Sequence, residues 1–365
     1  MSDARAATPD GTAAFVAQLR RRGVTDVPRG FDGLTLSSVG IGTYLGPADT
    51  VTDRIYEAAV ARALDLGCNV IDTAINYRCQ RSERAIGRAL AASRIPREQI
   101  VLATKGGYLP YDGEPPADPA AYVRQTFVAP GLIDPQDIVA GSHCLAPRFL
   151  AHQVDRSLAN LAVTCVDVYL LHNPETQLEE IAPDRFYDRM RAAFETLEAC
   201  VAGGRIRCYG VATWNGLRAS PTAAGLLSLE RLTDLARRVA GDRHHFRVVQ
   251  LPYSLAMPEA YTRKNQTVRG TLMTALEAAS ALNLYVMGSA ALYQNRLAQD
   301  LPADIRSRIP GLATDAQRAI HFVRSTPGIG TTLVGMKGVS HVEENLLTLA
   351  APPLSRADLD RLVPR

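Results

Sequence analysis

Residues 68–90, CNVIDTAINYRCQRSERAIGRAL, set the pattern on which the whole chain is built. A short apolar run ends at Asp72, a polar loop carrying Tyr77 follows, and a helical period begins at Ser82. A buried strand, a loop and an amphipathic helix in this order form one unit of a parallel α/β fold. The stretch therefore predicts a strand that delivers a carboxylate and a phenol to one edge of a sheet.

The same alternation of a short β-rich run with a longer helical period recurs eight times. The expected strands are 38–43, 68–72, 100–105, 166–171, 206–212, 246–251, 284–288 and 331–335. The expected helices are 53–66, 82–93, 147–161, 184–202, 225–240, 269–282, 314–325 and 339–349. Eight such units favour an α/β fold of the (β/α)8 TIM-barrel type, and an open doubly wound sheet is the alternative on pattern alone.

The remaining segments lie outside this rhythm. Residues 1–30 are expected to form an N-terminal extension, with a helix at 12–22, and residues 31–365 a single catalytic barrel domain. A hairpin at 31–37 is expected to plug the bottom of the barrel. Two long segments, 108–137 and 251–268, follow strands and should lie on the rim, where barrel enzymes carry their sites.

Composition narrows the functional class. The 365 residues are 47% apolar, and the formal net charge is only +3, which argues against binding of nucleic acid or a membrane surface through bulk charge. Six cysteines without a CxxC pair are typical of reduced thiols. The start of the sequence has no apolar secretory core, and no run is long enough to span a membrane. We therefore expect a soluble, cytoplasmic protein.

Four reactive side chains fall at or just after the ends of successive expected strands. Asp72 ends the second strand, Lys105 the third and His172 the fourth, while Tyr77 follows Asp72 in the same loop. A free tyrosine titrates near 10, and a nearby ammonium favours the phenolate and lowers that pKa. We expect Asp72 to pair with Lys105, His172 to orient a substrate oxygen, and Tyr77 to act as a general acid.

In several stretches the sequence resembles the aldo-keto reductase superfamily. They are GIGTYLG at 40–46, residues 69–90, IVLATKGG at 100–107, RSLANLAVTCVDVYLLHNPE at 156–175, GGRIRCYGVATWNG at 203–216 and TLVGMKGVSHVEENL at 332–346. The resemblance implies a (β/α)8 barrel and a catalytic tetrad of Asp72, Tyr77, Lys105 and His172. It also implies reduction of aldehydes or ketones by NADPH, with NADH possible, or the reverse oxidation of an alcohol.

The resemblance also implies a set of cofactor contacts. Gln250 matches the residue that holds the nicotinamide amide, Ser289 lies near the pyrophosphate, and Lys337 and His341 are the cations available to a 2′-phosphate. The full expected set is Gly42, Thr43, Tyr44, Asp72, Thr213, Gln250, Ser289, Gly335, Met336, Lys337, His341, Glu344 and Asn345. A helix amino terminus near Lys337 would suit a phosphate.

Some positions depart from the family pattern. Gly288 stands where an aromatic ring often stacks on the nicotinamide, and Thr213 stands where the family commonly has a Ser-Asn pair. Arg78 replaces the usual glycine after the tyrosine; with Gln80 and Arg81 it is expected to meet a polar or anionic substrate, and a solvated arginine is the alternative. Asn173 and Trp214 are the other residues expected at the substrate.

Two other functions stay open at this stage. Gly288 and Thr213 allow a nicotinamide-binding regulatory subunit with little turnover. A metal-dependent hydrolase would use His143, His172 and Asp72, although we expect His143 to be a packing group and the site to hold no metal. The partner is expected to be a small carbonyl or alcohol, and the sequence is silent on the oligomeric state.

Overall fold

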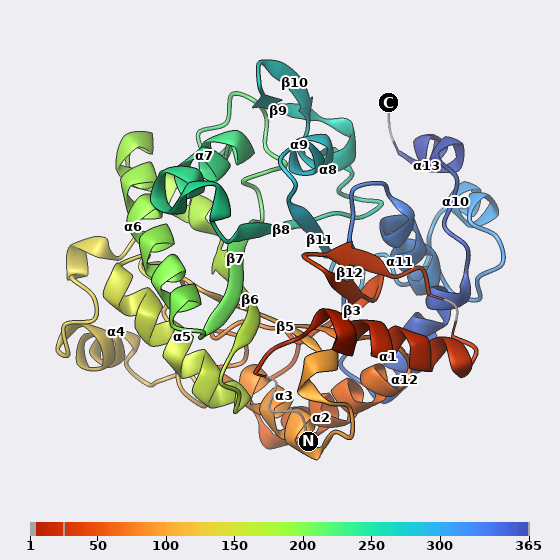
Figure 1. Cartoon of the computed structure of the whole chain (residues 1–365), viewed down its shortest axis with the longest axis horizontal. Coiled ribbons are helices and arrows are strands. Elements are labelled where there is room, and N and C mark those ends of the chain that lie inside the picture. Colours follow the sequence, from red (N-terminus) through yellow and green to blue (C-terminus); the bar gives the residue numbers. More distant parts are fainter. Residues whose placement is uncertain (1–4, 25, 364–365) are drawn as a thin grey trace.

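A computed structural model describes residues 5–24 and 26–363 of the chain. Eight parallel strands close into a barrel in the order β11-β12-β3-β4-β5-β6-β7-β8, surrounded by helices (Figure 1). The strands are β3 (Val39–Gly42), β4 (Val70–Asp72), β5 (Val101–Gly106), β6 (Val166–His172), β7 (Ile206–Ala212), β8 (Phe246–Pro252), β11 (Tyr285–Ser289) and β12 (Thr331–Gly335). The predicted TIM barrel is confirmed, and the open sheet is excluded.

One helix follows each barrel strand in the outer layer. These helices are α2 (Thr50–Asp65), α3 (Arg81–Ala92), α5 (Pro147–Leu161), α6 (Pro183–Ala202), α7 (Leu229–Ala240), α9 (Ala275–Ala281), α11 (Asp315–Ser325) and α12 (Val339–Leu346). Shorter helices lie between them, α4 (Pro119–Val123), α8 (Glu259–Thr262) and α10 (Ala303–Arg308), and α13 (Arg356–Leu362) follows α12. No helix of the described residues is long and apolar enough to cross a membrane.

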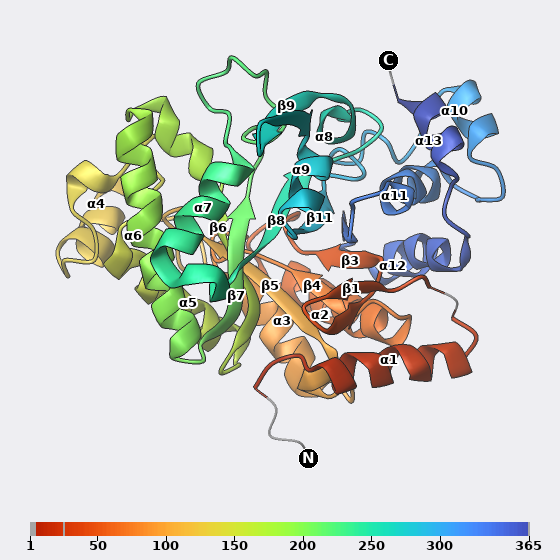
Figure 2. The same ribbon diagram turned by 45° about the horizontal axis from the view of Figure 1, so that its top comes forward.

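The bottom of the barrel is closed by a hairpin. Strands β1 (Arg29–Phe31) and β2 (Leu34–Leu36) pair antiparallel, and their apolar side chains pack with residues inside the barrel such as Val168 and Val248. Helix α1 (Pro9–Arg21) lies beside this hairpin, as Figure 2 shows along its lower edge. The expected plug is therefore present, and α1 begins three residues earlier than the predicted 12–22.

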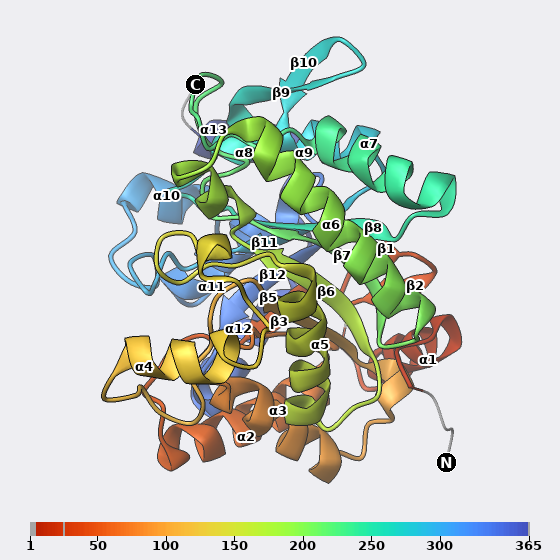
Figure 3. The same ribbon diagram turned by 90° about the vertical axis from the view of Figure 1, so that its left-hand side faces the viewer.

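One predicted helix began too early. Residues 269–274 form a turn and strand β10 (Thr271–Thr274), which pairs with β9 (Lys264–Val268) in a hairpin at the top of Figure 3. Arg269 and Gly270 both have a positive φ, of 50° and 78°. A two-residue turn with this geometry matches the twist of paired strands, so only α9 remains of the helix predicted at 269–282.

The long segment after β5 has a small core of its own. It contains α4 and the π-helical turn η2 (Arg124–Val128), and its apolar residues gather around Phe127 and Phe149. Of the described residues in this segment, only Tyr108, at its start, lines the cavity at the carboxyl ends of the barrel strands. No described residue of 251–268 lines that cavity, so this second segment does not contribute to the site as expected.

Candidate active site

A cavity of about 430 Å³ opens at the carboxyl ends of the barrel strands. The terminal residue of six strands lines it directly: Gly42, Asp72, His172, Ala212, Ser289 and Gly335. Gln250 of β8 also lines it, and Tyr108 follows β5. Because parallel strands place their carboxyl ends at one edge, side chains from distant parts of the sequence meet here.

An ion pair lies at the floor of this cavity. The Lys105 ammonium donates to both oxygens of Asp72, at 2.8 and 2.7 Å, and to the carbonyl oxygen of Thr73 at 2.8 Å. Lys105 is fully buried and Asp72 is 5% exposed. Burial lowers the pKa of Lys105, and the neighbouring carboxylate opposes that shift. An ammonium has three donors, so all of them are used and none remains for Tyr77.

Tyr77 lies above this pair and lines the cavity. The Lys105 ammonium is 5.0 Å from the centre of its ring, and the ring meets Tyr44 and His172 edge-on at centroid distances of 5.0 and 5.8 Å. Burial, and then the negative charge of Asp72, raise the pKa of Tyr77 well above its ordinary value. The expected lowering of this pKa is therefore wrong for this structure, because burial and the Asp72 carboxylate shift the pKa in the opposite direction.

His172 is held as a neutral ring. Burial lowers its pKa well below the ordinary value, and the positive charge of Lys105 adds to the shift. Its backbone carbonyl accepts a hydrogen bond of 2.8 Å from Nε2 of the buried His143, whose Nδ1 lies 2.8 Å from the Gln177 amide. With Nδ1 accepting from that amide, Nε2 carries the proton. His143 thus fixes the strand end that carries His172.

Two amide groups and one hydroxyl group complete the floor of the cavity. Gln250 donates from Nε2 to the Asp72 carboxylate at 2.8 Å, although it is expected to hold a carboxamide of the cofactor. The Thr213 hydroxyl oxygen and the Asn76 amide oxygen are buried without a hydrogen-bond partner, and both residues line the cavity. Buried polar atoms without partners are costly, so these two are available to a bound polar group.

The residues expected at the cofactor fall into two groups. Gly42, Thr43, Tyr44, Thr213, Gln250, Ser289 and Gly335 line the cavity together with Asp72. The others lie beyond it, just before α12 and along that helix: Lys337 and His341 are exposed, whereas the Met336 side chain is buried in the core and could contact a ligand only through its backbone.

The amino terminus of α12 is open to a ligand. Its N-cap, Gly338, offers no side-chain hydrogen bond, so the first amides of the helix are not capped by that residue. Glu344 accepts a hydrogen bond from Thr314 at 2.7 Å, and the buried amide oxygen of Asn345 has no partner. Free amides, an exposed Lys337 and an unpaired amide oxygen are suited to a phosphorylated, hydrogen-bonding ligand.

The residues expected at the substrate also fall into two groups, those that line the cavity and those that do not. Asn173 and Trp214 line the cavity, and Asn173 donates to the Tyr108 hydroxyl at 3.2 Å. Arg78 does not line it: its side chain is 1% exposed and is bonded to Asp53 and to two backbone carbonyls. The expectation that Arg78 meets the substrate is therefore wrong, because its guanidinium points back toward α2.

The absence of an aromatic ring at Gly288 does not affect the cavity wall, because position 288 faces the outer layer. A Cβ atom at this position would lie 3.2 Å from Val323 and 3.5 Å from Ile329 in the outer layer. An aromatic ring there would project between β11 and α11, away from the cavity, because alternate residues of a strand face opposite sides. The cavity wall beyond β11 comes instead from residues 290–295, which include Tyr293.

Three parts of the candidate site could not be recognised from the local sequence pattern alone. The loop 290–295 has no periodicity, and Tyr108 is one of several tyrosines in a long loop. Glu175 is the third: one of its oxygens accepts the backbone N–H groups of Trp214, Asn215 and Gly216 at 2.7, 2.9 and 3.1 Å. An acid directly after the HNP turn was the available signal for Glu175, and its role is to hold the loop that carries Trp214.

No group of three or more histidine, cysteine, aspartate or glutamate side chains suited to a metal occurs in the part of the chain that the structure describes. Two of the three residues of the hydrolase alternative, His143 and Asp72, are occupied otherwise, whereas Nδ1 of His172 is buried without a hydrogen-bond partner. His143 bonds to His172 and Gln177, and Asp72 bonds to Lys105 and Gln250.

The family model described as "Aldo/keto reductase family" matches residues 38–220. An NADH-specific methylglyoxal reductase from Escherichia coli is 28% identical over 191 residues, which is 51% of each chain. A 6-dehydroglucose reductase from Novosphingobium aromaticivorans is 27% identical over 191 residues, 51% of this chain and 50% of the relative. The chain thus spans about half the length of these curated relatives.

Solved structures share the fold over nearly the whole chain. An aldo/keto reductase from Klebsiella pneumoniae in complex with NADP and acetate has a TM-score of 0.62 and 22% identity, and covers 93% of this chain and 94% of its own. The holo form of an aldo-keto reductase from Bacillus halodurans gives 0.62 and 19%, covering 93% and 97%. At these identities the likeness concerns the fold.

Proposed function

This chain belongs to the aldo/keto reductase family, and from that premise we propose that it reduces an aldehyde or ketone with NADPH, or with NADH, and catalyses the reverse alcohol oxidation. The observation that carries the proposal is the Asp72–Lys105 ion pair directly beside Tyr77 and His172 in the cavity. A buried ion pair under a phenol and a neutral imidazole suits proton transfer to a substrate oxygen.

Tyr77 is the proposed proton donor. A general acid must hold its proton before the reaction, and the raised pKa of Tyr77 keeps the phenol protonated at neutral pH. As the proton leaves, the negative charge that develops on the phenol would lie close to the Lys105 ammonium, 5.0 Å from the ring centre. Lys105 therefore stabilises the product of the proton transfer more than its starting state, which is the requirement for catalysis.

A nicotinamide cofactor would supply the hydride. Thr213, Asn76 and Gln250 offer polar atoms in the cavity that could bind a carboxamide, and the amino terminus of α12 with Lys337 would hold a phosphate. His172 stays neutral, so its imidazole is suited to orienting a substrate oxygen by a hydrogen bond.

The proposed substrate is an uncharged carbonyl compound. The side chains of Tyr44, Tyr108, Asn173 and Trp214 in the cavity wall are neutral, and among the described residues no lysine or arginine lines the cavity. Aromatic faces and amide groups bind neutral polar molecules, whereas a carboxylate or phosphate on the substrate would need a cation here.

The six free cysteines support a cytoplasmic location.

A screen of neutral and anionic aldehydes, ketones and alcohols with both cofactors tests the proposal. We expect loss of the near-ultraviolet absorbance of NADPH with neutral carbonyls. Absence of turnover with every carbonyl and alcohol, for a protein that binds NADPH, would contradict it. Faster turnover of anionic than of neutral carbonyls would contradict the substrate class alone.

A further inference from the structure

We propose that Arg78 is a positioning residue, which ties the loop carrying Tyr77 to α2 and to the loop carrying Tyr44. This inference rests on the proposed function for its kinetic consequences. The mechanical part, a tether between two loops of the cavity rim, rests only on the contacts of Arg78.

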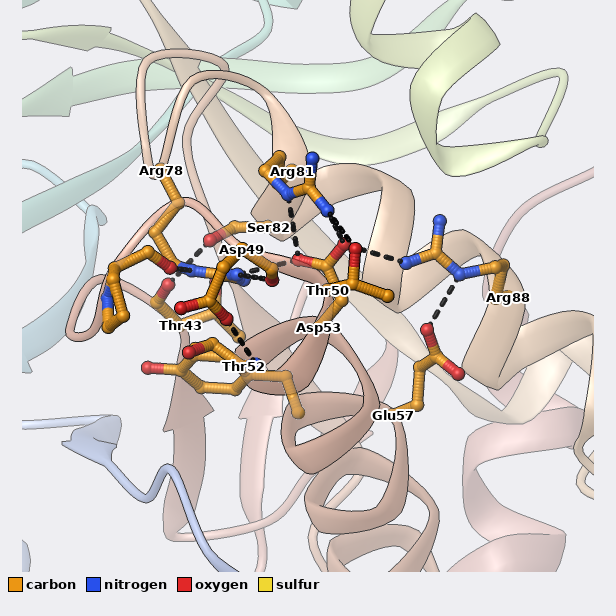
Figure 4. Close-up of polar contacts among 12 residues, drawn as sticks. Thr43, Asp49, Thr50, Thr52, Asp53, Glu57, Arg78, Arg81, Ser82 and Arg88 are labelled. Atoms are coloured by element: carbon orange, nitrogen blue, oxygen red, sulfur yellow. Dashed lines mark hydrogen bonds and ion pairs between the residues drawn. The ribbon is translucent and has the colours of Figure 1, made fainter. Parts of the chain in front are cut away.

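The guanidinium of Arg78 joins three acceptors outside its own loop (Figure 4). Its Nε donates to the carbonyl oxygen of Pro47 at 2.8 Å, and one terminal nitrogen donates to the carbonyl oxygen of Asp49 at 3.0 Å and to the Asp53 carboxylate at 2.6 Å. The side chain is 1% exposed and that of Asp53 is 6% exposed. A planar fork with fixed donors holds such a set of acceptors in one geometry, which a flexible ammonium does not.

Asp53 is a firm anchor for this fork. It lies in the first turn of α2, and it also accepts hydrogen bonds from Arg81 at 2.8 Å and Arg88 at 3.3 Å, as Figure 4 shows. Arg88 in turn pairs with Glu57 at 2.6 Å. Three guanidiniums around one carboxylate leave Asp53 paired even when one of them is removed.

The backbone next to Tyr77 needs such a tether. Arg78, Cys79 and Gln80 have φ values of 49°, 55° and 67°, so three consecutive residues other than glycine adopt the left-handed conformation. Residues with a Cβ avoid this region, and they persist in it only when the surrounding structure holds them there. The contacts of Arg78 are directly adjacent to Tyr77 and so fix where its ring lies.

The contacts of Arg78 also hold the loop that carries Tyr44, whose ring packs against Tyr77. Pro47 and Asp49 belong to the loop that carries Tyr44, and Tyr44 meets Tyr77 edge-on at 5.0 Å. The same loop is held by Ser82, whose hydroxyl donates to the carbonyl of Thr43 at 2.7 Å. Both rings thus belong to one fixed unit at the cavity mouth.

We expect the substitution Arg78→Met to lower kcat by about tenfold or more, because a proton donor displaced by about 1 Å loses much of its rate. The dissociation constant for NADPH should stay within about threefold of wild type, since Arg78 does not line the cavity. Arg88→Met is the matched control: it removes a guanidinium from the same carboxylate, at a half-exposed side chain away from Tyr77.

Arg78→Gly is the second variant, and glycine at φ 49° relieves one strained residue. It should fold even if Arg78→Met does not, and it should still lower kcat, because Cys79 and Gln80 remain in the left-handed region without the contacts of Arg78. Hydrogen–deuterium exchange gives a readout independent of turnover. Both segments, 43–49 and 73–80, should lose protection together in the Arg78 variants and stay protected in Arg88→Met.

Unchanged kcat in both Arg78 variants, or a loss confined to NADPH affinity, would overturn the positioning role. Unchanged exchange in the two segments would overturn the tether itself. If the wild-type protein reduces no carbonyl, the proposed function fails, and the exchange comparison between Arg78→Met and Arg88→Met still decides whether the tether exists.

Discussion

The substitution Lys105→Met tests the electrostatic core of the site through stability as well as activity. Methionine keeps the length of the side chain but removes the ammonium that makes three hydrogen bonds of 2.7 to 2.8 Å. The Asp72 carboxylate, 5% exposed, would keep only the hydrogen bond from Gln250. A buried charge that loses its partner costs about 3–5 kcal/mol of stability, and we expect a loss of that size.

The second substitution Asp72→Asn, added to Lys105→Met, separates charge from packing. It removes the unpaired carboxylate while keeping an oxygen that can accept the hydrogen bond from Gln250. We expect the double variant to regain most of the lost stability, about 2 kcal/mol or more, because a neutral pair avoids the penalty of a buried lone charge. Its activity should stay lost, since no cation remains near Tyr77.

Urea unfolding followed by far-ultraviolet circular dichroism measures these differences, with carbonyl reduction measured on the same samples. A loss below about 1 kcal/mol for Lys105→Met would show that the ammonium is not the buried partner of Asp72. Recovery of activity in the double variant would show that the ion pair acts only on stability.

Two further predictions concern the cofactor and acid stability. Lys337→Ala should weaken NADPH binding more than NADH binding, by about 1.5–3 kcal/mol for a charged phosphate contact; equal losses in titrations of both cofactors would refute this. Burial lowers the pKa of His143, and that of His321, to about 4 from 6.5. Each is neutral when folded, so its stabilisation is complete above pH 6.5 and is lost as the pH falls towards 4, by up to about 3 kcal/mol. A free energy of unfolding that stays constant over that range, measured with urea, would contradict this account.

Much of the barrel could be predicted because its information is local. The apolar run that ends at Asp72 and the similar runs ending near Lys105 and His172 mark parallel strands by composition alone. Parallel strands bring their carboxyl ends to one edge, so the meeting of these three side chains follows from the topology without any further contact.

The errors arose where the decisive contact is distant in the sequence. From the sequence, Arg78 is expected to meet a substrate or solvent, but its carboxylate partner, Asp53, lies 25 residues away on α2. Gly288 looked like a missing platform because a sequence position does not reveal which face of the strand its side chain would take. The raised pKa of Tyr77 depends on burial, which is a property of the packed site.

The hairpin β9–β10 shows a different limit of secondary-structure prediction from the sequence. Its turn and second strand, residues 269–274, fit the helical period of the residues that follow, but the positive φ of Arg269 and Gly270 turns the chain. Local propensity was overridden here by the pairing of two strands, which a single sequence does not display.

In the proposed mechanism, Tyr77 delivers the proton while binding of the cofactor depends on other residues. Single-turnover oxidation of bound NADPH by a neutral aldehyde, compared between wild type and Tyr77→Phe, separates these two roles. We expect the variant to slow the oxidation step by at least about a hundredfold and to keep its dissociation constant for NADPH. Oxidation at the wild-type rate in Tyr77→Phe would contradict it.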